Sequence, residues 1–146
     1  ISLLQPASAR LLEAMKPLAE ATVQALAEAD AGGDTFTVAW RSLSMALLEY
    51  RRGNYADAMR WSARCLGNAE TNAPRSATAR LITAMAHFQL GQGAEAQAEL
   101  ERVREVIAVK FEGVGDRGSP IRGFWFDWMF ARVLLREASG LVGAGL

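Results

Sequence analysis

The sequence predicts an all-α protein built from antiparallel helical hairpins. Apolar residues recur every three or four positions along most of the chain, which is the spacing of one helix face. Turn glycines divide this pattern into short segments, and the pattern of one hairpin returns 38 residues later. A period of this size is typical of arrays in which neighbouring hairpins bury one another's apolar faces. We expect about six helices in a single domain, residues 1–146, with a C-terminal helix that caps the stack.

Composition limits the classes of function. Half of the 146 residues are hydrophobic, and 16 basic residues balance 16 acidic ones. A nucleic-acid-binding surface normally needs a basic excess, so we expect no nucleic acid partner. No run approaches the roughly 20 apolar residues of a membrane-spanning helix, so no membrane insertion is expected. The chain begins at Ile1 without an initiator methionine, and we expect a piece of a longer cytoplasmic protein, although the parent could be membrane-anchored.

The first predicted element covers residues 7–30. Its apolar stripe has helical spacing, but Pro17 interrupts it. An interior proline removes one backbone hydrogen bond and clashes with the carbonyl four residues earlier, so a kink or break is expected near Met15. Gly32 and Gly33 end the element.

Two hairpins follow, at residues 36–66 and 75–109. The first is expected to turn at Gly53-Asn54, and Pro74 suits the start of the second. A shift of 38 residues places small residues on small ones and large on large. The matched pairs are Ala39 and Ala77, Leu43 and Leu81, Ala46 and Ala84, Leu47 and Met85, Tyr50 and Phe88, Gly53 and Gly91, Ala58 and Ala96, and Cys65 and Val103.

The last predicted helix covers residues 124–140. A Gly- and Pro-rich loop precedes it, and Gly140 and Gly143 end the ordered chain. Its stripe is unusually aromatic at the start. The stripe consists of Phe124, Trp128, Ala131, Leu135 and Ala138, widened by Trp125 and Met129.

No residue pattern predicts catalysis, a metal or a cofactor. Residues 113–118 match G-x-G-x-x-G, but the segment before them continues a helix, whereas a dinucleotide site needs a strand. We therefore interpret the motif as a connecting loop. His87 is the only histidine and Cys65 the only cysteine, so neither has partners for a metal site, and no disulfide can form within the chain.

The first hairpin resembles a tetratricopeptide repeat (TPR), a helix-turn-helix unit of about 34 residues. Small, aromatic and turn-glycine positions of that family are matched by Ala46, Tyr50, Gly53, Tyr55, Ala58, Cys65 and Leu66. The period here is four residues longer, and we place the excess between Gly67 and Pro74. The resemblance implies stacked hairpins and binding of a protein or peptide.

A finer resemblance is to the C-terminal TPR regions of large bacterial serine/threonine protein kinases. It rests on residues 3–6, 49–53, 123–128 and 135–138, which read LLQP, EYRRG, GFWFDW and LREA. The resemblance implies a parent protein whose catalytic domain lies upstream. No kinase motif lies in this chain, so we expect no enzymatic activity from it.

The first helices of TPR hairpins line a concave groove, and the resemblance places a candidate partner-binding groove on this chain. The candidate residues are Trp40, Leu43, Leu47, Tyr50, Arg51, Leu81, Met85 and Phe88. The aromatic start of the last helix is a second candidate, either as an interface or as the cap that we favour. It comprises Phe124, Trp125, Trp128 and Met129.

We therefore expect a non-catalytic interaction or scaffold module whose partners are a protein, a peptide or other domains of the parent chain. Two alternatives stay open. A small-ligand-binding or regulatory helical domain would carry a closed pocket under Trp40 and Trp61. A self-associating spacer would form a homodimer through the last helix.

Overall fold

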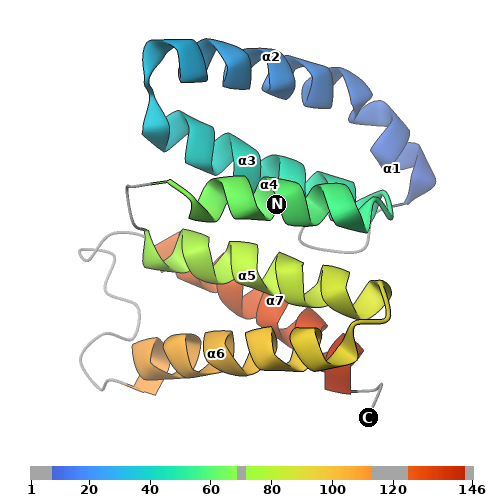
Figure 1. The fold of residues 1–146 in the computed structure, drawn as a ribbon, viewed down its shortest axis with the longest axis vertical. Helices are drawn as coiled ribbons and strands as arrows, with labels where there is room; N and C mark the ends of the chain where they lie inside the picture. Colours follow the sequence, from blue (N-terminus) through green and yellow to red (C-terminus); the bar gives the residue numbers. More distant parts are fainter. Residues whose placement is uncertain (1–7, 69–71, 113–124, 144–146) are drawn as a thin grey trace. The chain divides into compact units, whose positions relative to one another are not determined.

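The structure, a computed structural model, describes residues 8–68, 72–112 and 125–143. In these ranges the chain forms seven helices and no strand (Figure 1), which confirms the predicted all-α class. The chain divides into two compact units, Ile1–Thr71 and Asn72–Leu146. The division falls between the two predicted hairpins.

The first unit begins with two helices, α1 (Ala9–Ala14) and α2 (Lys16–Gly32). Met15 ends one and begins the other, so the predicted break near this residue is confirmed. Pro17 lies in the first turn of α2, where its missing N–H costs no helical hydrogen bond. Ser8 caps α1 by accepting a hydrogen bond from the backbone of Leu11.

The helices α3 (Thr35–Arg51) and α4 (Tyr55–Leu66) form the first hairpin. Their close approach rests on alanines, because Ala39, Ala46 and Ala58 have no exposed surface. The other side of α3 packs on α2. There Met45 and Leu48 meet two buried residues of α2, with Trp61 of α4 packed against them. Figure 1 shows α2 and α3 running antiparallel.

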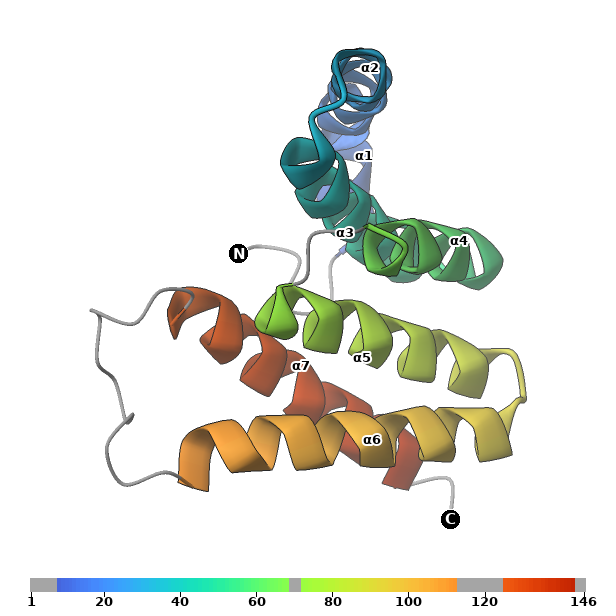
Figure 2. The ribbon, with the colours of Figure 1, turned by 60° about the vertical axis from the view of Figure 1, so that its left-hand side comes forward.

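The second unit contains α5 (Ala73–Gln89), α6 (Gly93–Glu112) and α7 (Trp125–Gly143). The first two form a hairpin, and α7 crosses both of them obliquely (Figure 2). All three helices contribute to one core. Its fully buried large side chains include Leu81, Ile82, Met85, Leu100, Val103 and Leu134.

The 38-residue repeat governs the helix boundaries. Both α3 and α5 have 17 residues and start 38 positions apart. Their capping residues, Asp34 and Asn72, have the same offset, and each accepts a hydrogen bond at 3.0 Å from the N–H three residues later. The turn glycines Gly53 and Gly91 adopt φ angles of 83° and 77°. The pattern in the sequence therefore marks a repeat of local structure.

The break at Met15 divides the N-terminal segment into two helices, so the described residues contain seven helices where about six were expected. Two boundaries differ from the prediction. The helix α6 continues to Glu112, beyond the predicted end at Val109, and α7 continues to Gly143. The extra turn of α6 carries Phe111, whose ring contacts Arg132 of α7, 4.9 Å from the ring centroid. The extra turn of α6 therefore packs against α7, and the repeat in the sequence does not predict this turn.

Candidate interaction surfaces

The residues of the predicted groove are mostly buried. Leu43, Leu47 and Tyr50 on α3 are between 7 and 9% exposed, and Leu81 and Met85 on α5 have no exposed surface. These five side chains belong to the cores of their units. The other three, Trp40, Arg51 and Phe88, are half-buried and retain contact with solvent.

The second predicted surface, at the start of the last helix, also contains both buried and half-buried residues. Trp128 is 8% exposed, so most of its indole lies in the core of the second unit, and Met129 is half-buried. Phe124 lies outside the described residues, as does the side chain of Trp125. The neighbouring ring, Phe126, is 73% exposed. Phe126, an accessible aromatic residue of α7, was therefore omitted from the predicted site.

The turn of the first hairpin contains a buried carboxylate, although the sequence gives no sign of its burial. Glu49 is 8% exposed. One oxygen accepts a hydrogen bond from Arg52 at 2.9 Å and the other from Asn54 at 2.6 Å. The two donors supply the partners that a buried charge requires.

A charged clasp joins α2 to α4. The guanidinium of Arg64 forms an ion pair with Asp30 and lies over the ring of Trp61, 5.4 Å from its centroid. Both charged side chains are more than a third exposed, so the clasp adds little to stability. Trp61 also packs against the α2–α3 core, and none of the three pockets described below is lined by Trp61 or Trp40.

An arginine is buried in the second unit. Arg75, on α5, is 2% exposed. Asp127 lies in the first turn of α7, and desolvation raises its pKa above the ordinary value, an effect that the charge of Arg75 partly offsets. The helical periodicity of the sequence does not predict a buried position for Arg75 or the desolvation of Asp127, because charged residues are normally exposed.

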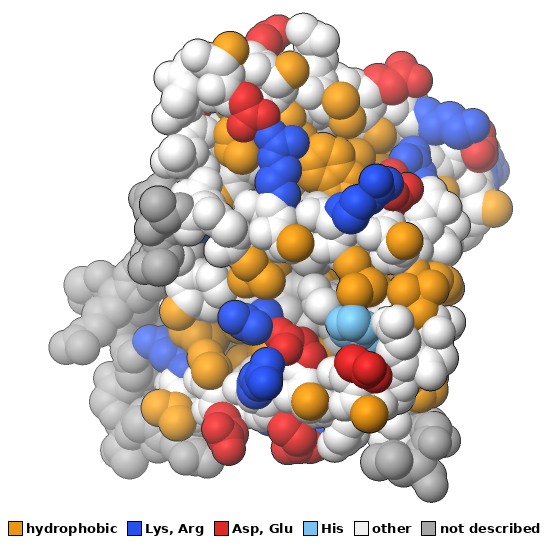
Figure 3. All heavy atoms as spheres, in the orientation of Figure 1, with side chains coloured by type: hydrophobic (Ala, Val, Ile, Leu, Met, Phe, Trp, Pro, Cys, Tyr) orange, Lys and Arg blue, Asp and Glu red, His pale blue; other side chains and the backbone are white. Residues whose placement is uncertain are grey.

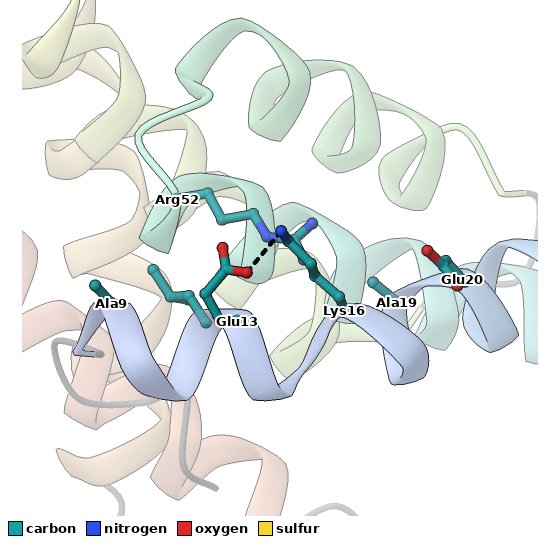
Figure 4. Close-up of a pocket in the computed structure, with 7 residues that line it drawn as sticks. Ala9, Glu13, Lys16, Ala19, Glu20 and Arg52 are labelled. Carbon is teal, nitrogen blue, oxygen red and sulfur yellow. Dashed lines mark ion pairs between the residues drawn. The ribbon is translucent and has the colours of Figure 1, made fainter.

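The first pocket, of about 500 Å³, lies between α1, α2 and the end of α3 (Figure 4). Glu13 and Lys16 form an ion pair across 2.6 Å at its mouth, and Arg52 reaches toward them from α3. Its four charged side chains are two acids and two bases, and the ion pair is mostly exposed. The pocket therefore has no charge preference that would select a ligand.

The second pocket, of about 370 Å³, is a groove between α5 and α6. The carboxylate of Glu99 lies between two arginines there, 2.7 Å from Arg80 and 3.4 Å from Arg102. Val103 and Val106 supply an apolar wall. Figure 3 shows this mixture on the face that carries α5 and α6, where basic and acidic side chains lie among hydrophobic ones.

The third pocket, of about 410 Å³, lies between α6 and α7. Its apolar lining includes Ile107, Phe111 and Leu135, and Arg132 covers the ring of Phe111. Outside the lining of this pocket, α6 exposes Val109 and α7 exposes Phe126, each to 73%. The second unit thus combines a groove with exposed apolar side chains on the same two helices.

Candidate metal ligands do not gather in the described parts of the chain. Within those parts, no three His, Cys, Asp or Glu side chains lie together as a metal site would require. Cys65 is buried, and the His87 ring nitrogen Nδ1 lies 2.6 Å from Gln92 across the second hairpin turn. The G-x-G-x-x-G motif at residues 113–118 lies outside the described residues.

Comparison of the chain with protein-family models, with curated proteins and with solved structures gave no match. No described helix combines the length and the apolar character that crossing a membrane requires. The described helices define an all-α protein with two helical hairpins, α3–α4 and α5–α6.

Proposed function

We propose that this chain is a non-catalytic protein-interaction module of TPR type, part of a larger bacterial signalling protein such as a serine/threonine kinase. The observation that carries the interaction role is the exposed apolar surface of the second unit. Val106 and Val109 share one face of α6 and are 49 and 73% exposed, and Val106 lines the groove between α5 and α6. Exposed apolar side chains around a groove are typical of partner-binding sites.

The repeat supports the TPR part of the proposal. Two hairpins with matched caps, turn glycines and small buried positions are what stacked repeats need, because each hairpin alone leaves an apolar face uncovered. The kinase parent rests on the short segments quoted from the sequence. Cytoplasmic location belongs to the same proposal.

Site-specific photo-crosslinking tests the interaction role. A photoreactive phenylalanine analogue replaces Val109, and in a control it replaces Ala63, an exposed alanine of α4. In cells that produce the full-length parent, we expect a discrete heavier adduct only from position 109. The adduct partner, identified by mass spectrometry, must then bind the purified chain directly. Equal adducts at both positions, or none at 109, would contradict the proposal.

Self-association is the second candidate function, because Phe126 and Val133 expose apolar surface on one face of α7, at 73 and 39%. The same experiment, with the analogue placed also at position 126, separates it from the first. If the adduct at position 109 or 126 contains this chain alone, and light scattering gives the mass of a dimer, the module is a self-associating spacer.

A further inference from the structure

We propose that the groove between α5 and α6 binds the carboxylate of an acidic residue in a partner peptide, with an apolar neighbour of that residue against Val106. The inference rests on the proposed interaction function and names the chemistry that one of its surfaces would recognise. It begins from the ion-pair network of Arg80, Glu99 and Arg102.

The network contains two positively charged side chains and one negatively charged side chain. Glu99 carries a single negative charge, and its side chain is only 14% exposed. Arg80 holds one of its oxygens at 2.7 Å, a normal distance for a charge-assisted hydrogen bond. Arg102 approaches the other oxygen at 3.4 Å, beyond that normal distance, and its side chain is 72% exposed. The groove therefore retains a net positive charge at Arg102.

The surroundings of Arg102 fit an anion better than a cation. Within the groove, the described lining residues are Ala73, Ser76, Ala77, Arg80, Arg102, Val103 and Val106. None of them is acidic, and Glu99 is already paired. Ala73 and Ser76 also belong to the first turn of the 17-residue helix α5, whose N-terminal end favours negative charge. Both features add to the attraction that Arg102 exerts on a carboxylate.

The apolar part of the groove limits the ligand further. Val103 is buried at the base, whereas Val106, one helical turn along the same face, is 49% exposed. A volume of about 370 Å³ accommodates one or two side chains and not a folded domain. An acidic residue followed by an aliphatic one matches both halves of the groove. Recognition of this kind is complementary in charge, so it would weaken as salt rises.

The test uses the whole chain and an array of immobilised twelve-residue peptides. One set places glutamate beside leucine, a second replaces each glutamate with glutamine, and a third replaces it with phosphoserine. The chain is tested as wild type, as Arg102→Gln, as Val106→Ser and as Arg136→Gln. Arg136 is an exposed arginine of α7 outside the groove, so its variant is the matched control. Circular dichroism verifies that each variant folds.

We expect wild type to prefer the glutamate set over the glutamine set. Arg102→Gln should bind those peptides about 1.5 to 5 times more weakly, the range for one exposed ion pair, and Arg136→Gln should match wild type. Val106→Ser should weaken binding to leucine peptides without changing the preference for glutamate. Equal loss in both arginine variants, or a preference only for phosphoserine, would overturn the assignment.

The outcome also distinguishes this inference from the proposed function. Binding that depends on leucine but is equal for glutamate and glutamine would overturn the carboxylate site, while the interaction module would stand. Absence of binding to every peptide would overturn the carboxylate site as well. The function itself is then decided by the crosslinking at Val109, which is not among the residues that line the α5–α6 groove.

Discussion

Asn54 donates a hydrogen bond from Nδ2 to the buried carboxylate of Glu49, across 2.6 Å and around the turn that joins α3 to α4. The backbone N–H of Asn54 also bonds the carbonyl of Glu49 at 2.9 Å. Thirty-eight residues later, Gln92 and His87 are related in the same way, with both the side-chain and the backbone contacts conserved in position. A side-chain bridge thus closes each hairpin turn, although the residues that form the two bridges differ.

Loss of the first bridge should destabilise the chain. Glu49→Ala leaves Arg52 and Asn54 without their shared acceptor in a partly buried site, and we expect a loss of about 1–3 kcal/mol in the free energy of unfolding. Urea denaturation followed by circular dichroism measures it. Glu28→Ala is the control, because Glu28 bonds Gln24 on the exposed face of α2. A similar small change in both variants would show that the bridge is unimportant.

The turn glycines should resist substitution. Gly91 has a φ of 77°, where a side chain adds strain, so Gly91→Ala is expected to cost about 1 kcal/mol or more. Gly93, two residues later, begins α6 with nothing within 4 Å of an added Cβ. Gly93→Ala should therefore be neutral or stabilising. If the two variants have equal midpoints of thermal unfolding, the left-handed conformation of Gly91 is not required.

Two buried hydroxyls should be dispensable. The Oγ atoms of Ser42 and Ser62 have no exposed surface and no hydrogen-bond partner in the structure. Replacing either serine with alanine removes a desolvated polar group, and we expect stability to rise by about 1 kcal/mol. Ser44→Ala controls for helix propensity, since Ser44 lies on the exposed face of α3 and bonds the carbonyl of Trp40. Destabilisation of the buried variants relative to Ser44→Ala would contradict this account.

Two aspartates should give opposite pH dependences. Hydrogen bonds from Thr37 lower the pKa of Asp34, so its stabilising effect is present above its ordinary pKa and is lost as the pH falls through the lowered value. Desolvation raises the pKa of Asp127, partly offset by Arg75, so its contribution is greatest below the ordinary pKa and falls as the pH rises through the raised value.

Variants separate these contributions. We expect the stability lost in Asp34→Ala to shrink as the pH falls below its ordinary value of 3.8. Asp127→Asn should flatten the decline of stability as the pH rises above 3.8. Urea denaturation at a series of pH values gives both slopes. The same sign of slope change in both variants would show that the two carboxylates do not differ as described.

Trp128 and Phe126 test whether the start of α7 is core or interface. Trp128 is 8% exposed, so Trp128→Ala is expected to cost about 3–5 kcal/mol. Phe126 is 73% exposed, so Phe126→Ala should leave stability within about 0.5 kcal/mol. Light scattering gives the molar mass of each. A dimer that only Phe126→Ala splits would assign self-association to α7, whereas a folded and stable Trp128→Ala would show that Trp128 is not a core residue.

Much of the local structure could be predicted from the sequence. The break at Met15, the turn at Gly53 and the 38-residue period all depend on contacts between residues close in the chain. Caps, prolines and turn glycines act over four or five residues, so their positions suffice to locate helix ends. The predicted length of α6 was wrong. Its last turn packs against α7, which is distant in the sequence, and local rules for helix ends do not include such contacts.

The candidate surfaces were harder to predict. A helical stripe shows which residues share a face but not how far a neighbouring helix covers that face. Leu81 and Met85 were predicted to line a groove and are fully buried, whereas Phe126 was omitted and is exposed. The pairing of Glu99 with arginines from two helices also needs the α5–α6 packing, because Arg80 and Glu99 are 19 residues apart.

The sequence by itself determined that this protein is helical, where most of its helices begin, and that one hairpin is repeated. These properties follow from backbone preferences and from periodicity, which are local. Only the tertiary structure decided which side chains became core, such as Arg75 and Trp128, and which remained available to a partner, such as Arg102 and Val109. Burial depends on the packing of helices that are distant in the chain, and a residue's own neighbours in sequence do not specify it.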